Sequence, residues 1–249
     1  MSRLDSIGLV VVLAAVASMP FHALIARSRD ADVARRPTTI LLGAWVRDWL
    51  MWLIGPLERL LVRLGARPLL FNLLGAAFGL AAGIAFARGA LSAGGWLVLL
   101  GGLSDVIDGR LARALKMVSR SGAFLDSTLD RFAEMFAFAG LAVYFAGSPR
   151  RVMVVALALG ASLLVSYTRA RGQALGVECH GGIMQRAERL VLLALAALFD
   201  AGFAAWTHRA PGTLLAAALT LIAAGSIATA IYRTRVIARA LARDGAKPG

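Results

Sequence analysis

The chain has few of the residues that build disulfides and zinc sites. Its 249 residues include one cysteine, Cys179, and three histidines. A single thiol cannot form an intrachain disulfide, and it cannot supply the clustered thiolates of a structural zinc site. Acidic residues are also scarce, because 14 Asp and Glu stand against 27 Lys and Arg. A cluster of carboxylates in such a chain is therefore informative.

Long polar segments are absent as well. No linker, low-complexity tract or strong internal repeat separates a soluble domain from the rest. Hydrophobic residues instead make up 59% of the chain, and the mean hydropathy is +0.74. Soluble domains are closer to half apolar. The composition therefore predicts a single all-α membrane domain.

Apolar runs give the expected fold. The run at 7–26 predicts an extra N-terminal membrane helix, retained or cleaved. Residues 40–64 carry three tryptophans at helical spacing among charged residues, which is typical of a juxtamembrane amphipathic helix; a short buried helix is the alternative. We expect 1–39 to be an anchor with a basic linker and 40–249 to be the main domain. Six further runs are long enough to cross a bilayer as a helical bundle: 68–88, 91–109, 122–146, 151–169, 188–206 and 212–233.

The net charge of +13 comes mostly from segments after the second, fourth and sixth runs. All three lie on one side of the predicted bundle, which the positive-inside rule makes cytoplasmic. Such residues also contact anionic membrane lipids. There is no basic face with aromatic stacking residues, so nucleic acid is not an expected partner.

Four aspartates flank the predicted turn between the second and third runs. Asp105 and Asp108 are three residues apart, and Asp126 and Asp130 are four apart. Each spacing puts a pair on one helix face, and the turn brings the two faces together. Clustered carboxylates repel one another unless a hard cation binds them. Without nearby histidine or cysteine, Mg²⁺ or Mn²⁺ is expected rather than zinc; unrelated solvated aspartates are the alternative.

Glycines and an arginine accompany these aspartates. Gly109 and Gly122 lack side chains, so a phosphate or base can approach their backbone. Arg113 lies one turn beyond Gly109 and can hold a phosphate. Metal, glycine and arginine together predict a pyrophosphate substrate.

The same residues carry a family resemblance. Their spacing reads D-x-x-D-G-x-x-A-R-x8-G-x3-D-x3-D, which resembles the motif of the CDP-alcohol phosphatidyltransferases. The match covers eight fixed positions, and the wider resemblance covers roughly residues 40–240. The eight positions are Asp105, Asp108, Gly109, Ala112, Arg113, Gly122, Asp126 and Asp130.

The resemblance implies a Mg²⁺- or Mn²⁺-dependent enzyme, with two ions, in the bacterial inner membrane. Its active site would face the cytoplasm, and homodimers are common in the family. A hydroxyl acceptor would attack a CDP-linked lipid, such as CDP-diacylglycerol, and release CMP. Asp105, Asp108, Asp126 and Asp130 would bind metal, with Asp130 also the general base. The residues expected to contact the CDP-lipid are Asn72, Asp105, Gly109, Arg113, Ser119 and Gly122; the family often has threonine where Asn72 stands.

Further along, the chain resembles family members that use inositol phosphate. The segments 166–171 and 186–189 match theirs, except that Ala187 stands where they have proline. The resemblance implies a phosphorylated acceptor, and the alternative is that these arginines only follow the charge rule for cytoplasmic loops. The implied acceptor-binding residues are Ser166, Arg169, Arg171, Arg189 and Arg233.

Three other functions stay open at this point. Glycerol phosphate could replace inositol phosphate as the acceptor. A membrane prenyltransferase also uses aspartates and Mg²⁺, but in two separated motifs. A divalent-cation transporter would need polar residues in mid-membrane, where these runs are apolar.

Overall fold

The computed structural model describes residues 3–25 and 43–244, and within these ranges all regular structure is helical. Residues predicted to form the basic linker, 27–36, and Lys247 lie outside the described residues. Eight helices are described: α1 (Arg3–Ile25), α3 (Ala44–Arg63), α4 (Pro68–Ala87), α5 (Leu91–Ala114), α6 (Arg120–Tyr144), α7 (Pro149–Ala174), α8 (Arg186–Thr207) and α9 (Thr213–Asp244).

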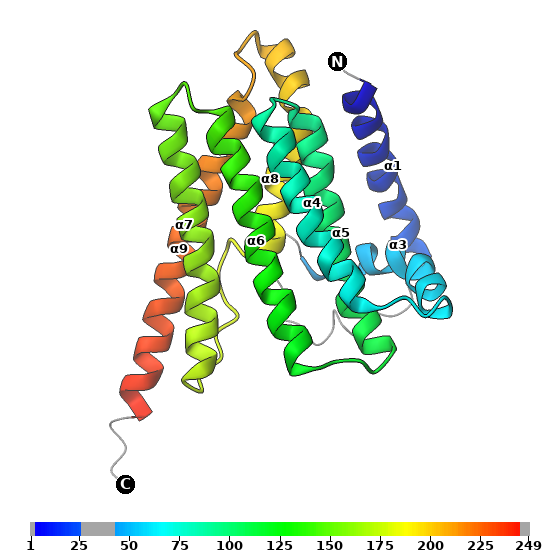
Figure 1. The fold of residues 1–249 in the computed structure, drawn as a ribbon, viewed down its shortest axis with the longest axis vertical. Helices are drawn as coiled ribbons and strands as arrows, with labels where there is room; N and C mark the ends of the chain where they lie inside the picture. The colour runs from blue at the N-terminus through cyan, green and yellow to red at the C-terminus, as the bar shows by residue number, and fades with distance from the viewer. Residues whose placement is uncertain (1–2, 26–42, 245–249) are drawn as a thin grey trace.

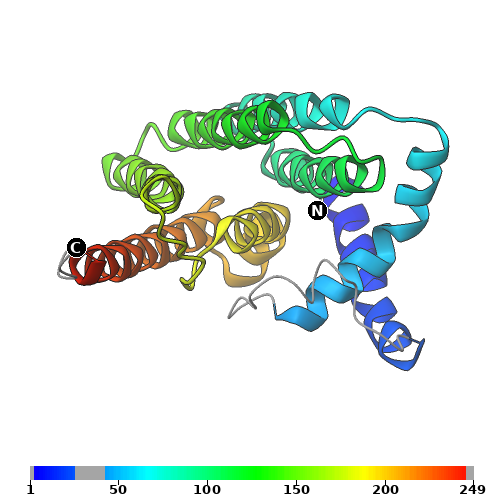
Figure 2. The ribbon, with the colours of Figure 1, turned by 90° about the horizontal axis from the view of Figure 1, so that it is seen from below.

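Helices α4 to α9 form the predicted six-helix bundle. They run along the long axis of the molecule (Figure 1). Viewed along that axis, α4, α5 and α6 lie on one side and α7, α8 and α9 on the other (Figure 2). Apolar side chains from both groups form the main core, including Phe86, Leu141, Leu193, Leu219 and Ile222.

Glycines bring α4 against α6. A Cβ atom added to Gly83 would overlap the Phe136 carbonyl, and one added to Gly140 would overlap the Gly83 backbone. Gly79 meets Ala133 in the same way. Only residues without side chains allow two helix backbones to approach this closely. This contact holds the aspartate-bearing helix α6 beside α4.

Within the described ranges, five helices are long and apolar enough to cross a membrane: α4, α5, α7, α8 and α9. Helix α6 has the length, but charged residues of the candidate site, Asp126, Asp130, Arg131 and Glu134 among them, interrupt its apolar character. Many large apolar side chains on these helices face outward, for example Leu164, Leu221 and Ile231. An outward apolar surface of this kind is what a lipid environment requires.

Helices α1 and α3 lie outside the bundle, next to α5 (Figure 2). Helix α3 lies across the bundle axis, near the end that carries the α5–α6 turn (Figure 1). It buries Ile54 against Ile107 and Leu111 of α5, whereas Trp45 and Trp52 stay exposed. This arrangement agrees with the predicted amphipathic helix.

Helix α1 meets α3 through Trp49, whose indole N–H donates to the Ser18 hydroxyl at 2.8 Å. The predicted N-terminal helix is thus present. Its apolar segment, Leu13–Leu24, is shorter than the five spans. The role of α1 as a membrane anchor stays a prediction.

Several helices continue past the predicted runs. Helix α5 ends at Ala114, α7 at Ala174 and α9 at Asp244. The predicted runs stop earlier, because they end where apolar residues give way to charged ones. A helix continues through Arg and Lys, which are good helix formers. Arg113, Arg169 and Arg171 therefore lie on helices rather than in loops.

Candidate active site

Three aspartates converge between α5 and α6. One carboxylate oxygen from each of Asp105, Asp108 and Asp126 lies within 4.8 Å of the other two. Asp108 is buried, and the other two are half-buried. The predicted pairing of helix faces therefore brings these three side chains together.

Helix α4 adds an amide to this cluster. The Asn72 side-chain N–H donates to Asp126 at 3.4 Å. Asn72 begins the second turn of α4, and the glycine contacts further along hold this helix against α6. The position where the resembling family often has threonine thus carries a side chain that donates a hydrogen bond to an aspartate of the cluster.

Asp130 lies one turn along α6 from Asp126 and is bound by an arginine. The Arg186 guanidinium reaches an Asp130 oxygen at 2.5 Å and an Asp105 oxygen at 2.8 Å. One arginine from the start of α8 thus bridges α5 and α6. Sequence reasoning placed Arg186 in a basic segment but missed this role.

A second set of ionic contacts continues deeper in the bundle. Glu134 is one turn beyond Asp130, and its carboxylate lies 3.1 Å from two guanidinium nitrogens of Arg189. Both side chains are almost fully buried, at 5% and 2% exposure. Arg131 contacts Asp130 and Glu134 at 3.8 Å and donates to the Ser166 hydroxyl of α7.

This network links α5, α6, α7 and α8 around the candidate site. Sequence reasoning did not select Arg131 or Glu134. A signal for Glu134 was available, because its position four residues after Asp130 puts it on the same helix face.

The α5–α6 turn is shaped by a helix cap and by two glycines. The Ser119 hydroxyl accepts the Gly122 backbone N–H at 3.0 Å and caps α6. A Cβ atom on Gly122 would lie 2.9 Å from that hydroxyl oxygen, so the cap itself favours glycine there. Arg113 turns its guanidinium back toward Gly109, where an added Cβ would lie 3.3 Å from it. Gly109 and Arg113 are therefore neighbours beside Asp108.

The predicted acceptor residues fall into two groups. Arg169 and Arg171 are exposed on the last turns of α7. Arg189 and Arg233 are buried and already have protein partners. Arg233 donates to the carbonyl oxygens of Gly181 at 2.9 Å and Val165 at 2.8 Å. The acceptor-binding role of these arginines stays a prediction.

The donor set fits a hard divalent cation. The three clustered groups offer only carboxylate oxygens, which Mg²⁺ and Mn²⁺ prefer. Carboxylates this close repel one another and need positive charge nearby. Arg186 supplies part of it by bridging Asp105 and Asp130. Oxygen donors, convergence and the need for positive charge together point to a divalent-metal site.

Comparison with known proteins identifies the class. The family model of the CDP-alcohol phosphatidyltransferases matches residues 66–237, and the chain belongs to this family. It is therefore a transferase, and its apolar helices make it an integral membrane protein. This confirms the resemblance expected from the aspartate motif.

Individual relatives point to one branch of the family. The chain is 38% identical over 208 residues to the phosphatidylinositol phosphate synthase of Streptomyces avermitilis, covering 80% of this chain and 83% of the relative. It also resembles the crystal structure of the Mycobacterium tuberculosis phosphatidylinositol phosphate synthase with CDP-DAG bound. That match has a TM-score of 0.64 and 30% identity, over 73% of this chain and 92% of the other.

A second structure of the mycobacterial enzyme is in complex with manganese and citrate. It matches with the same TM-score of 0.64 and 30% identity, over 73% of this chain and 87% of the other. These comparisons do not favour the transporter or the prenyltransferase alternative.

Proposed function

We propose that the protein transfers a phosphatidyl group from CDP-diacylglycerol to a hydroxyl of inositol phosphate and releases CMP. The observation that carries this proposal is the convergence of Asp105, Asp108 and Asp126, with Asn72 and Asp130 beside them. The similarity to phosphatidylinositol phosphate synthases over most of the chain supports this choice of donor and acceptor.

Asp105, Asp108 and Asp126 would hold the divalent metal, with Asp130 as a further ligand to a second ion. When bound, Mg²⁺ or Mn²⁺ would neutralise the pyrophosphate and stabilise charge on the departing CMP. Gly109, Arg113 and Gly122 would receive the CDP part, with Asn72 and Ser119 fixing the carboxylate and the helix end around it. Residues 40–249 would form this catalytic membrane domain, and 1–39 its anchor.

Asp130 would accept the proton of the attacking hydroxyl. The acceptor oxygen forms a bond to the phosphorus that bears the lipid, and the bond from that phosphorus to the CMP oxygen breaks. A cavity of about 40 Å³ reaches Asp130, Glu134 and Arg186 between α4, α5, α6 and α8. Glycines line its opposite wall, which leaves room next to the proposed base.

The acceptor phosphate would bind on the arginine-rich side of the candidate site. Arg169 and Arg171 are exposed, and Ser166 lies between them and Arg131. Arg189 and Arg233 would act from buried positions and shape the pocket through their protein contacts. Arg186 would exchange part of its carboxylate contact for substrate phosphate once metal occupies the site.

The basic ends of α5, α7 and α9 support a cytoplasmic orientation of the aspartate end. We propose a location in the bacterial inner membrane and a homodimeric assembly, as in the resembling family. Accessibility of a single cysteine placed at Arg120, in cells with the native Cys179 replaced, tests the orientation. Labelling from the outside of intact cells would contradict it.

The function is tested by CMP release. Purified protein with Mg²⁺ or Mn²⁺ and CDP-diacylglycerol should release CMP when inositol phosphate is added, and EDTA should abolish the release. Asp130→Asn should lower turnover by about 10²–10⁴-fold while Mn²⁺ binding at Asp105, Asp108 and Asp126 persists. Full activity of this variant would remove the general-base role.

The acceptor panel separates the alternatives. Release with glycerol phosphate but not inositol phosphate would move the assignment to phosphatidylglycerophosphate synthesis. No release with any acceptor, together with metal flux into proteoliposomes, would favour transport.

A further inference from the structure

A cavity lies at the end of the bundle away from the aspartates. It has a volume of about 210 Å³. It is lined where α6 passes into α7 and where α9 begins, and these segments lie far from the α5–α6 turn (Figure 1). Its lining comes from the end of α6, the start of α7 and the start of α9: Phe145, Arg150, Arg151, Val154, Ala216, Ala217, Leu219 and Thr220.

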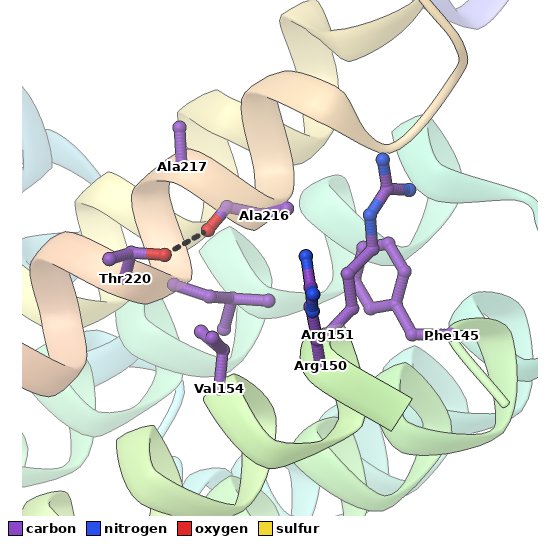
Figure 3. A pocket seen from close by; sticks show the side chains of 8 residues that line it. Phe145, Arg150, Arg151, Val154, Ala216, Ala217 and Thr220 are labelled. Atoms are coloured by element: carbon purple, nitrogen blue, oxygen red, sulfur yellow. Dashed lines mark hydrogen bonds between the residues drawn. The ribbon is translucent and has the colours of Figure 1, made fainter. Parts of the chain in front are cut away.

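Two arginines stand at the mouth of this cavity (Figure 3). Arg150 is exposed and Arg151 is half-buried. The Arg151 guanidinium carbon lies 5.4 Å from the centre of the Phe145 ring, and this contact holds the cation over an apolar wall. Both residues depart from the main charge pattern, because most of the described basic residues lie toward the opposite end.

No carboxylate lines the cavity among the described residues. The acidic residue that the bundle places near this end, Asp200, is fully buried and faces the backbone instead. Its oxygens accept the N–H groups of Gly212 at 2.5 Å and Leu215 at 3.1 Å. The cavity mouth therefore carries two positive charges, which favour an anionic ligand.

The inner wall of the cavity is apolar. It is formed by Val154, Leu219 and two alanines, and the Thr220 hydroxyl is turned away to the Ala216 carbonyl at 2.8 Å. Exposed apolar side chains continue along α7 and α9 beyond the cavity, including Met153 and Leu157 on α7 and Leu221 on α9. An occupant must thus be anionic at one end and apolar along its length.

We infer that this cavity binds the phosphate headgroup of an anionic glycerophospholipid, in the membrane leaflet opposite the aspartate site. The phosphate would lie on Arg150 and Arg151, and an acyl chain would follow the exposed faces of α7 and α9. Basic pockets between membrane helices bind lipid headgroups in this way. A free phosphate ion would leave the apolar wall in contact with water, so the geometry favours a lipid.

Binding of phosphatidylglycerol to the detergent-purified full chain tests this inference, with bound lipid counted by native mass spectrometry. Arg150→Gln and Arg151→Gln should each weaken binding by about tenfold, the usual effect of losing one charge-assisted hydrogen bond. Arg209→Gln is the matched control, because Arg209 is an exposed arginine at the same end that does not line the cavity. It should change binding less than twofold.

A second variant tests the cavity without removing charge. Ala217→Phe places a ring in the lining, and it should lower phosphatidylglycerol binding while both arginines remain. Unfolding midpoints measured without lipid verify that each variant is folded.

Four results would overturn the inference. They are equal binding of phosphatidylcholine, an equal loss in Arg209→Gln, full binding by Ala217→Phe, or the same thermal stabilisation by inorganic phosphate alone as by the lipid. The cavity lies at the other end of the bundle from the aspartates, so failure here would leave the proposed transferase function untouched.

Discussion

The buried pair of Glu134 and Arg189 makes a quantitative prediction. Their side chains are 5% and 2% exposed, and a Glu134 oxygen lies 3.1 Å from the guanidinium. Removing one partner of such a pair leaves an uncompensated buried charge, which costs about 3–5 kcal/mol. We expect Glu134→Ala and Arg189→Ala each to lower the free energy of unfolding by that amount.

The double variant distinguishes pairing from other effects. With both charges gone, neither is left unpaired, so the loss should fall well short of the sum, with a coupling energy of about 2–3 kcal/mol. Unfolding in mixed micelles with increasing SDS, followed by circular dichroism, measures all three variants. Glu178→Ala is the control, because that carboxylate is 75% exposed beside His180 and should contribute within about 0.5 kcal/mol.

Additive losses, with a coupling energy below about 0.5 kcal/mol, would refute the reasoning. They would mean that Glu134 does not neutralise Arg189, and that Arg189 is available to bind a phosphate. A selective rise in the KM for inositol phosphate in Arg189→Lys, without loss of stability, would support the same conclusion.

Three further predictions follow from particular contacts. Arg186→Gln should raise the affinity for Mn²⁺ roughly tenfold, because Arg186 competes with the metal for Asp105 and Asp130. Calorimetry measures this affinity, with Arg120→Gln as the control, and an unchanged affinity would contradict the competition. Gly83→Ala should cost about 1–3 kcal/mol by SDS unfolding, because its Cβ meets the Phe136 carbonyl, whereas Gly160→Ala, with open space around it, should be neutral or stabilising. Asp200→Ala should cost about 2–3 kcal/mol, because the Gly212 and Leu215 N–H groups lose their acceptor; an unchanged KM for both substrates would place its role in folding alone.

Much of the fold follows from apolar length and small residues. The six bundle helices could be located because each run is long enough to cross hydrocarbon. The Gly79 and Gly83 contacts could be expected from their spacing, because small residues four apart line one helix face. The helix ends could not be placed, since α7 and α9 continue through arginine-rich segments that a hydropathy boundary excludes.

The aspartate half of the candidate site could be predicted. The spacings of Asp105, Asp108 and Asp126 fix helix faces, and one turn between two helices brings those faces together. The cationic half depends on how α8 sits against α6, which local spacing does not determine. Arg186 therefore looked like one of several basic residues, although it reaches both Asp105 and Asp130.

The ion pairs of the candidate site explain why so many arginines accompany the aspartates. Arg186 is shared by Asp105 and Asp130, Arg131 by Asp130 and Glu134, and Glu134 also holds Arg189. A divalent cation held by the aspartates would supply the positive charge that Arg186 now provides. The Arg186 guanidinium would then be free to pair with the negative charge of a substrate phosphate. Metal and phosphorylated acceptor should therefore bind cooperatively. The metal would pair with the aspartates that Arg186 leaves, and the phosphate would pair with the Arg186 that the metal displaces.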